Sequence, residues 1–110
     1  MPTSLILILS TVPDRETAHH LATALVEQRL AACVNLLPQV TSVYEWQGKV
    51  EQSDEILLLI KTTKHNYPAV ESVLRAKHPY ELPEILAVPV EQGLTDYLDW
   101  VERCTKTDTT

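Results

Sequence analysis

Glycine is scarce in this chain: its 110 residues include only Gly48 and Gly93. Phosphate-binding loops of the Rossmann and P-loop kinds need several glycines within a few positions, because the backbone must turn tightly beside the phosphate. Those nucleotide sites are therefore excluded. The sequence also lacks a Gly-x-Ser-x-Gly motif and a Ser/His/Asp arrangement of the kind that hydrolases use. We therefore predict a protein that is not an enzyme.

Basic residues are the second shortage. Nine Lys and Arg stand against 15 Asp and Glu, which gives a formal net charge of −6. Phosphate backbones and anionic lipid surfaces repel such a molecule at long range. We expect neither nucleic acid nor a membrane among its partners. Phenylalanine is absent, so the core must be built from aliphatic side chains.

Cysteine is limited to Cys33 and Cys104. Two cysteines outside any Cys-x-x-Cys spacing are too few for a disulfide framework, and they fit a reducing compartment. The apolar run at 5–9 is shorter than a signal-peptide core or a transmembrane helix, and no basic stretch precedes it. These features predict a cytoplasmic protein.

Hydrophobic periodicity predicts one domain spanning residues 1–110. A continuous apolar run at 4–10 predicts a buried strand. A helix follows, capped by Asp14 and extending to Arg29, with apolar residues three and four positions apart. A period-two pattern then predicts two long strands, 34–46 and 50–63, joined by a turn at Gly48. Pro38 should bend the first strand or place it at an edge of the sheet.

The last part of the chain predicts a helix at 67–77 with Pro68 in its first turn, a strand at 85–90 and a helix at 95–104. After about residue 104 we expect a polar tail that frays. The order of elements is that of an α+β fold, an α/β sandwich of the ferredoxin-like βαββαβ type. An extra C-terminal helix and a long central hairpin are added to it.

The central hairpin is longer than a small sheet needs, because strands typically have five or six residues. Its excess length leaves unpaired edge groups that invite pairing with another chain. Glu51, Asp54 and Glu55 place charge on only part of this edge. The simplest cover is another copy of the same chain, so the sequence predicts self-association.

The densest cluster of functional groups is the segment 78–84, which reads His-Pro-Tyr-Glu-Leu-Pro-Glu. Two prolines stiffen it, and its imidazole and carboxylates form an incomplete ligand set for a divalent ion. In the alternative interpretation the prolines only shape the approach to the next strand, while Tyr80 packs and the glutamates face water. Both interpretations stand at this point.

Two further features indicate binding. Lys61 ends a run of aliphatic residues, where its ammonium is costly to bury unless it meets a carboxylate such as Glu55 or Glu84, or an anionic ligand. The alternative is that the strand reaches solvent there. Tyr44 and Trp46 share one side of a strand near the hairpin tip, and their amphipathic rings suit an interface. A small satellite cluster beneath the hairpin is the other interpretation.

Six short segments together point to a family. They are TVPD at 11–14, LAACVN at 30–35, SVYEWQGK at 42–49, KT at 61–62, HPYELPE at 78–84 and YLDW at 97–100. In this order they resemble the CutA family of divalent-cation-tolerance proteins, and the likeness covers about residues 4–102. The resemblance implies a ferredoxin-like subunit and a homotrimer whose long hairpins pair across subunits. It also implies a likeness to the PII signalling proteins, with a small-molecule pocket between subunits.

The resemblance further implies tolerance of copper and other divalent metals. In enterobacterial relatives, copper is attributed to a cysteine before the Thr-x-Pro-Asp segment and to two consecutive histidines. The matching positions here hold Ser10, Lys77 and His78. Two of the three ligands are replaced, and Lys77 adds a positive charge. We therefore expect no required cofactor and at most weak binding of Cu²⁺, with His78 as the remaining metal ligand.

The first functional hypothesis is a homotrimeric, non-catalytic binding protein associated with tolerance of divalent metal ions. His78 lies beside its ligand cleft, which we place between subunits. The residues expected to line this cleft are Tyr44, Trp46, Lys61, Tyr80 and Glu84.

Two alternatives remain. The second hypothesis is a PII-like sensor of a small anionic metabolite bound between subunits, with Lys61 supplying the positive charge. The third is a hydrolytic or transfer enzyme in which His78 acts with Glu81 or Glu84 as acid and base. No nucleophile accompanies those residues in the sequence.

Overall fold

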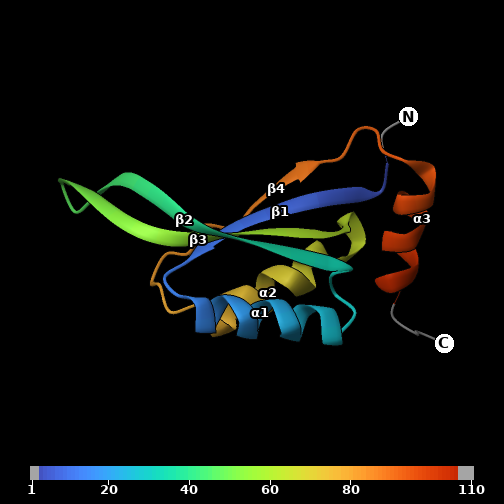
Figure 1. Cartoon of the computed structure of the whole chain (residues 1–110), viewed down its shortest axis with the longest axis horizontal. Coiled ribbons are helices and arrows are strands. Elements are labelled where there is room, and N and C mark those ends of the chain that lie inside the picture. The colour runs from blue at the N-terminus through green and yellow to red at the C-terminus, as the bar shows by residue number, and fades with distance from the viewer. Residues whose placement is uncertain (1–2, 107–110) are drawn as a thin grey trace.

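The computed structural model describes residues 3–106 and is built on a four-stranded antiparallel sheet (Figure 1). The strands lie in the order β2-β3-β1-β4, which is the ferredoxin-like arrangement, so the predicted fold class is confirmed. The elements are β1 (Leu5–Val12), α1 (Arg15–Glu27), β2 (Cys33–Trp46), β3 (Lys49–Thr63), the short 3₁₀ helix η1 (Lys64–Asn66), α2 (Tyr67–Lys77), β4 (Leu86–Pro89) and α3 (Thr95–Cys104).

Helices α1 and α2 pack side by side on one face of the sheet (Figure 1). We call this side the covered face. Its strand residues alternate with those of the opposite side, and the helices present apolar residues at three- and four-residue spacing. The fully buried apolar side chains are aliphatic, as the lack of phenylalanine predicts, and the hydroxyl residues Ser10 and Thr62 are buried with them. Large apolar side chains that are fully buried there are Ile8, Leu21, Leu25, Leu58, Ile60, Val70 and Leu74.

Local sequence signals fix the helix ends. Asp14 caps α1, because its carboxylate accepts a hydrogen bond from the backbone N–H of Thr17 at 2.8 Å. The predicted bounds of α2 and α3 agree with the structure. Helix α1 ends at Glu27, two residues before the predicted end, because Arg29 adopts a left-handed φ of 61° that a helix cannot continue through.

The hairpin of β2 and β3 extends well beyond the rest of the sheet (Figure 1). Its register shifts between Leu37 and Val40, where Pro38 lies and Gln39 has a φ of 64°, so the predicted bend is confirmed. Strand β3 pairs with β1 only from Ile56 onward. Residues 40–55 therefore form a two-stranded extension, which we call the ribbon.

The opposite end of the sheet is closed by α3. Its Val101 packs on Leu5 of β1 and on Ala32. Strand β4 is shorter than predicted and pairs with β1 at an edge, where Pro89 costs no ladder bond to a further strand. Thr105 is buried and hydrogen-bonded to Val101, so the tail is anchored at least this far. The rest of the tail expected to fray, 107–110, lies outside the described residues.

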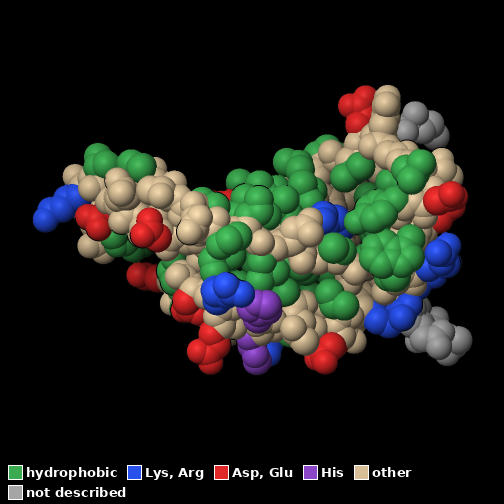
Figure 2. Space-filling view, viewed as in Figure 1, with side chains coloured by type: hydrophobic (Ala, Val, Ile, Leu, Met, Phe, Trp, Pro, Cys, Tyr) green, Lys and Arg blue, Asp and Glu red, His purple; other side chains and the backbone are tan. Residues whose placement is uncertain are grey.

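The second face of the sheet carries no helix over most of its area (Figure 1). We call it the open face. The strand register places on it a set of apolar residues: Leu7, Leu9, Leu37, Leu57, Leu59, Leu86 and Val88. Figure 2 shows hydrophobic side chains gathered over the strands and beside α3. No helix within residues 3–106 is both long and apolar enough to cross a membrane.

Candidate functional site

A cavity of about 730 Å³ lies where the ribbon meets the segment that follows α2. Strand β2 contributes its consecutive residues 42–46. The segment after α2 contributes residues 79–82 and Glu84, while Thr11 and Glu55 come from β1 and β3. The cavity therefore joins four parts of the chain, and it includes four of the five residues predicted to line the cleft: Tyr44, Trp46, Tyr80 and Glu84.

His78 anchors the segment that forms one wall. Its imidazole is 9% exposed, and Nε2 lies 2.8 Å from the carbonyl oxygen of Thr11. Nδ1 accepts a hydrogen bond from the backbone N–H of Tyr80 at 3.1 Å. Because a carbonyl oxygen can only accept, these bonds fit a neutral ring with its proton on Nε2. The imidazole also packs against the ring of Tyr80, with centroids 4.8 Å apart.

Tyr80 and Glu55 form a polar contact in the lining of the cavity. The Tyr80 hydroxyl donates to Oε2 of Glu55 at 2.7 Å, and Glu55 is only 7% exposed. Burial raises the pKa of Tyr80 well above its ordinary value, and the hydrogen bond to Glu55 and the negative charge of that carboxylate raise it further. The phenol therefore stays protonated and serves as a permanent donor to Glu55.

The ribbon wall is held by bonds between its own strands. The Tyr44 hydroxyl lies 2.8 Å from Oγ of Ser53 on the neighbouring strand. Glu45 accepts a hydrogen bond from the backbone N–H of Gly48 at 2.6 Å, which tightens the turn, where Gly48 has a φ of 83°. Trp46, beside this turn, is 39% exposed. The bond to Ser53 holds Tyr44 in the lining of the cavity, and the bond within the turn holds the end of the ribbon beside Trp46.

The lining is acidic and aromatic. It contains four glutamates and three aromatic residues, and none of the described residues that line it is Lys, Arg or His. Carboxylates on one cavity reinforce one another's potential, because the surrounding protein screens charge less than water does. Within residues 3–106, no group of three or more His, Cys, Asp or Glu side chains is arranged to hold a metal ion.

The sequence matches the model of the CutA1 divalent ion tolerance protein family over residues 6–104. The chain belongs to this family. The divalent-cation tolerance protein CutA of Thermus thermophilus is 51% identical over 98 residues, which are 89% of this chain and 95% of that protein. Protein CutA of Mus musculus is 48% identical over 106 residues, and the match spans 60% of its length.

Solved structures of CutA proteins agree with the fold. The protein from Thermus thermophilus superposes with a TM-score of 0.91 at 49% identity, covering 93% of this chain and 99% of that one. CutA from Xylella fastidiosa gives a TM-score of 0.93 at 46% identity, covering 94% and 100%. The suspected resemblance is therefore confirmed.

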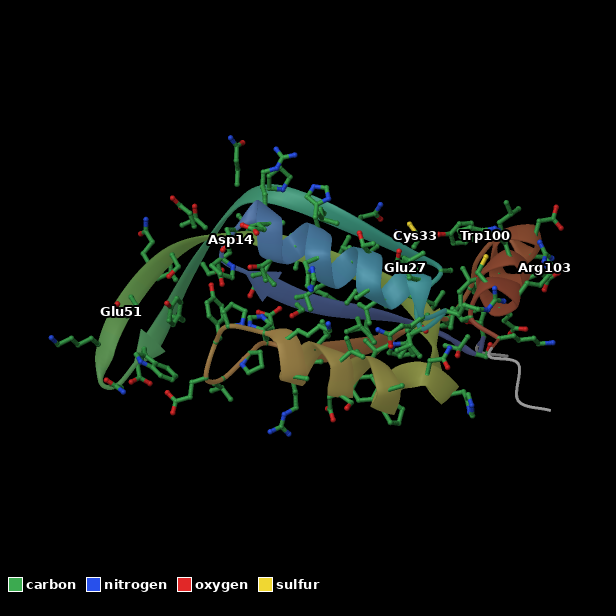
Figure 3. All side chains as sticks on the ribbon, turned by 90° about the horizontal axis from the view of Figure 1, so that it is seen from below. Asp14, Glu27, Cys33, Glu51, Trp100 and Arg103 are labelled. Atoms are coloured by element: carbon green, nitrogen blue, oxygen red, sulfur yellow. The ribbon has the colours of Figure 1, made fainter. Side chains whose placement is uncertain are left out.

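Lys61, the fifth predicted cleft residue, does not line the cavity of this CutA family chain. Its ammonium contacts the side-chain oxygen of Asn35 and lies 3.8 Å from the sulfur of Cys33. Cys33 lies at the end of the sheet nearest α3, whereas Glu51 marks the far ribbon (Figure 3). The suggested pairing of Lys61 with Glu55 or Glu84 is therefore wrong within one chain, and Lys61 as a residue of a cleft between subunits stays a prediction.

The three positions matched to the copper ligands of CutA relatives differ in their burial and hydrogen bonding. Ser10 is fully buried on the covered face, and its hydroxyl has no hydrogen-bond partner. Lys77 is exposed at the end of α2. Both ring nitrogens of His78 already hold hydrogen bonds, so a metal ion would have to displace one of them. His78 as a metal ligand stays a prediction.

Glu55 is the site residue that the sequence interpretation placed incorrectly, since it was taken as an edge charge or a partner of Lys61. The available signal was its position directly before the aliphatic run that starts at Ile56. A carboxylate at that position is buried because the strand that follows it enters the sheet. Thr11 and Ser42 begin the family segments TVPD and SVYEWQGK, but neither was predicted from the sequence as a site residue.

Proposed function

We propose that this chain is a homotrimeric, non-catalytic binding protein of the divalent-cation tolerance type, acting in the cytoplasm. The observation that carries the proposal is the cavity in which three aromatic residues and four carboxylates converge. A concave site in which polar groups lie beside aromatic and aliphatic side chains is typical of a ligand site. The third hypothesis, an enzyme using His78 with Glu81 or Glu84, has less support because both nitrogens of His78 are engaged in structural bonds.

The open face supports assembly. Leu86 is 58% exposed and Val88 is 44% exposed in one subunit. Monomeric proteins rarely leave a contiguous apolar surface of this kind in water, since its burial is the main force for association. Continuous with this face, the ribbon of residues 40–55 lacks a third strand on either side within the described chain. If the ribbon paired with a neighbouring copy, the contact would bury the apolar open face and the unpaired ribbon edges together.

A contact between the free edge of β2 in one copy and the free edge of β3 in the next is heterologous, because the two edges belong to different strands. A heterologous contact forms a ring where its rotation closes and an open filament where it does not. Three copies is the number that the family resemblance implies. Light scattering during size-exclusion chromatography is expected to give three times the 12.4 kDa of one chain. A folded particle of one chain at micromolar concentration would contradict the assembly.

The metal part of the proposal is tested by titrating Cu²⁺ into the assembled protein. We expect weak binding that His78→Ala abolishes, because the imidazole is the one matched copper ligand that remains. His20→Ala is the matched control, since His20 is exposed on α1 and does not line the cavity. Strong binding that survives His78→Ala would place the metal elsewhere on the protein.

The PII-like alternative, a sensor of an anionic metabolite, depends on Lys61. In one subunit this lysine contacts Asn35 and Cys33, and the charged residues that line the cavity within the described part of the chain are all acidic. This distribution gives the alternative less support than the first hypothesis. Native mass spectrometry of protein taken directly from cells tests it, because a bound anion should be lost in Lys61→Ala.

A further inference from the structure

The charge around the cavity is of one sign. Glu45, Glu55, Glu81 and Glu84 line it, and none of the described lining residues is basic. The whole chain adds to this field, with a formal net charge of −6. A cleft lined by one sign of charge concentrates ligands of the opposite sign, because its protein walls focus the field. The potential of this cavity therefore selects a cation.

Glu55 marks the point at which that cation would be held. Its side chain is 7% exposed, and its only hydrogen-bond donor among the described side chains is the neutral Tyr80 hydroxyl on Oε2. A buried carboxylate without a positive partner is costly, because burial removes hydration that one neutral donor replaces only in part. A ligand cation in the cavity would supply the missing charge.

The other lining residues indicate what chemical group is attached to the cation. Tyr44, Trp46 and Tyr80 supply aromatic rings, and Val43 and Leu82 supply aliphatic surface. Aromatic faces attract ammonium groups through their quadrupole. A hydrated divalent metal ion would gain little from such walls, since it prefers several oxygen ligands, and no group of three acidic, His or Cys side chains suited to a metal occurs in residues 3–106.

We propose that this cavity binds an organic cation, a protonated amine or quaternary ammonium group attached to a hydrophobic body. The ammonium lies against the carboxylates of Glu55 and Glu84, and the body lies against the rings of Tyr44, Trp46 and Tyr80. A volume of about 730 Å³ is large enough for a small molecule of this class. The inference rests on the ligand cleft of the proposed function and names the class of its ligand.

Three probes with the same phenyl body and different charge test this inference: phenethylammonium, 2-phenylethanol and 3-phenylpropanoate. Each is titrated into the full-length protein while the change in tryptophan fluorescence and the heat are followed. We expect phenethylammonium to bind at least about tenfold more tightly than the neutral alcohol, because the carboxylates attract only the cation. No binding of the carboxylate probe is expected.

Variants locate the binding. Glu55→Gln keeps an acceptor for Tyr80 but removes the charge, and it should lower the affinity for phenethylammonium about tenfold. Trp46→Leu should weaken it roughly fivefold, the effect of losing one cation–π contact. Glu84→Gln removes a charge at an exposed position and serves if Glu55→Gln does not fold. The control is Glu27→Gln, an equal change of charge on exposed α1, which should leave the affinity unchanged.

The outcomes separate this inference from the proposed function. Equal or tighter binding of the neutral or anionic probe would overturn the inference. Binding of no probe by a particle of three chains would also overturn it, because a neighbouring subunit would then fill the cavity, while the proposed assembly would stand. A particle of one chain would overturn the assembly alone, since every residue named above belongs to one subunit and the same titration still decides the charge preference.

Discussion

The covered and open faces of the sheet are built by alternate residues of the same strands, yet one chain completes only the first. On the covered face, Ile8, Leu58 and Ile60 are fully buried under α1 and α2. On the open face, Leu86 and Val88 are 58% and 44% exposed, and α3 covers only one end. The comparison shows that an apolar strand face can be encoded for a partner as well as for the chain's own helices.

The sharpest test of this comparison is a charge on the open face. Leu59→Glu would place a carboxylate among Leu9, Leu57 and Leu86, where assembly would have to bury it without a partner. We expect the particle to fall to the mass of one chain with its helical circular dichroism retained. Val26→Glu, on the exposed outer side of α1, should leave the mass unchanged. An unchanged mass for Leu59→Glu would mean that the open face is not the interface.

The covered face should respond through stability. Leu58 is fully buried between the sheet and the helices, so Leu58→Ala removes buried surface and leaves a cavity. Such replacements cost about 2–5 kcal/mol of unfolding free energy. Urea unfolding at one fixed protein concentration measures the loss. Val50→Ala, at a ribbon position that is 79% exposed, should change it by less than about 0.5 kcal/mol. Similar losses at both positions would contradict the distinction.

Two buried hydroxyls on the covered face should respond in opposite directions. Ser10 Oγ has no hydrogen-bond partner, whereas Thr62 Oγ1 donates to the carbonyl oxygen of Leu30 at 2.6 Å. Removing an unsatisfied group recovers its desolvation cost, so Ser10→Ala should raise the unfolding free energy by about 1 kcal/mol. Thr62→Val should lower it by about 1 kcal/mol. A loss of stability in Ser10→Ala would reveal a hydrogen bond from that hydroxyl.

Local chemistry explains which parts of the fold could be predicted from the sequence. Asp14 as a cap, Pro68 in a first turn and Pro38 as a bend each act within a few residues, and all three are observed where predicted. The end of α1 was missed because Arg29 takes a left-handed φ without being glycine. Nothing in its identity signals that conformation.

The site could be predicted only in part, because its contacts depend on register between distant strands. Tyr80 and Glu55 are 25 positions apart, and their bond exists because the segment after α2 returns to the start of the β3–β1 pairing. A carboxylate was one of the partners suggested for Lys61, but the β2–β3 register places Cys33 opposite it. A period-two pattern predicts on which face of the sheet a residue lies. It does not predict the register between strands, and the register decides which residue lies opposite on the neighbouring strand.

The smallest expected effect concerns the cap of α1, at the edge of the covered face. The hydrogen bonds that Thr17 donates hold the pKa of Asp14 below its ordinary value, so folding favours the ionised carboxylate. The stabilisation is present above the ordinary pKa of an aspartate, and it is lost as the pH falls through the lowered pKa of the folded state. Asp14→Asn keeps an acceptor for Thr17 but does not titrate.

Melting curves should show the natural protein slightly more stable than Asp14→Asn at neutral pH, and this difference should disappear in acid. A difference that stays constant into acid would mean that the cap acts through its oxygen alone and that its charge contributes nothing to the covered face.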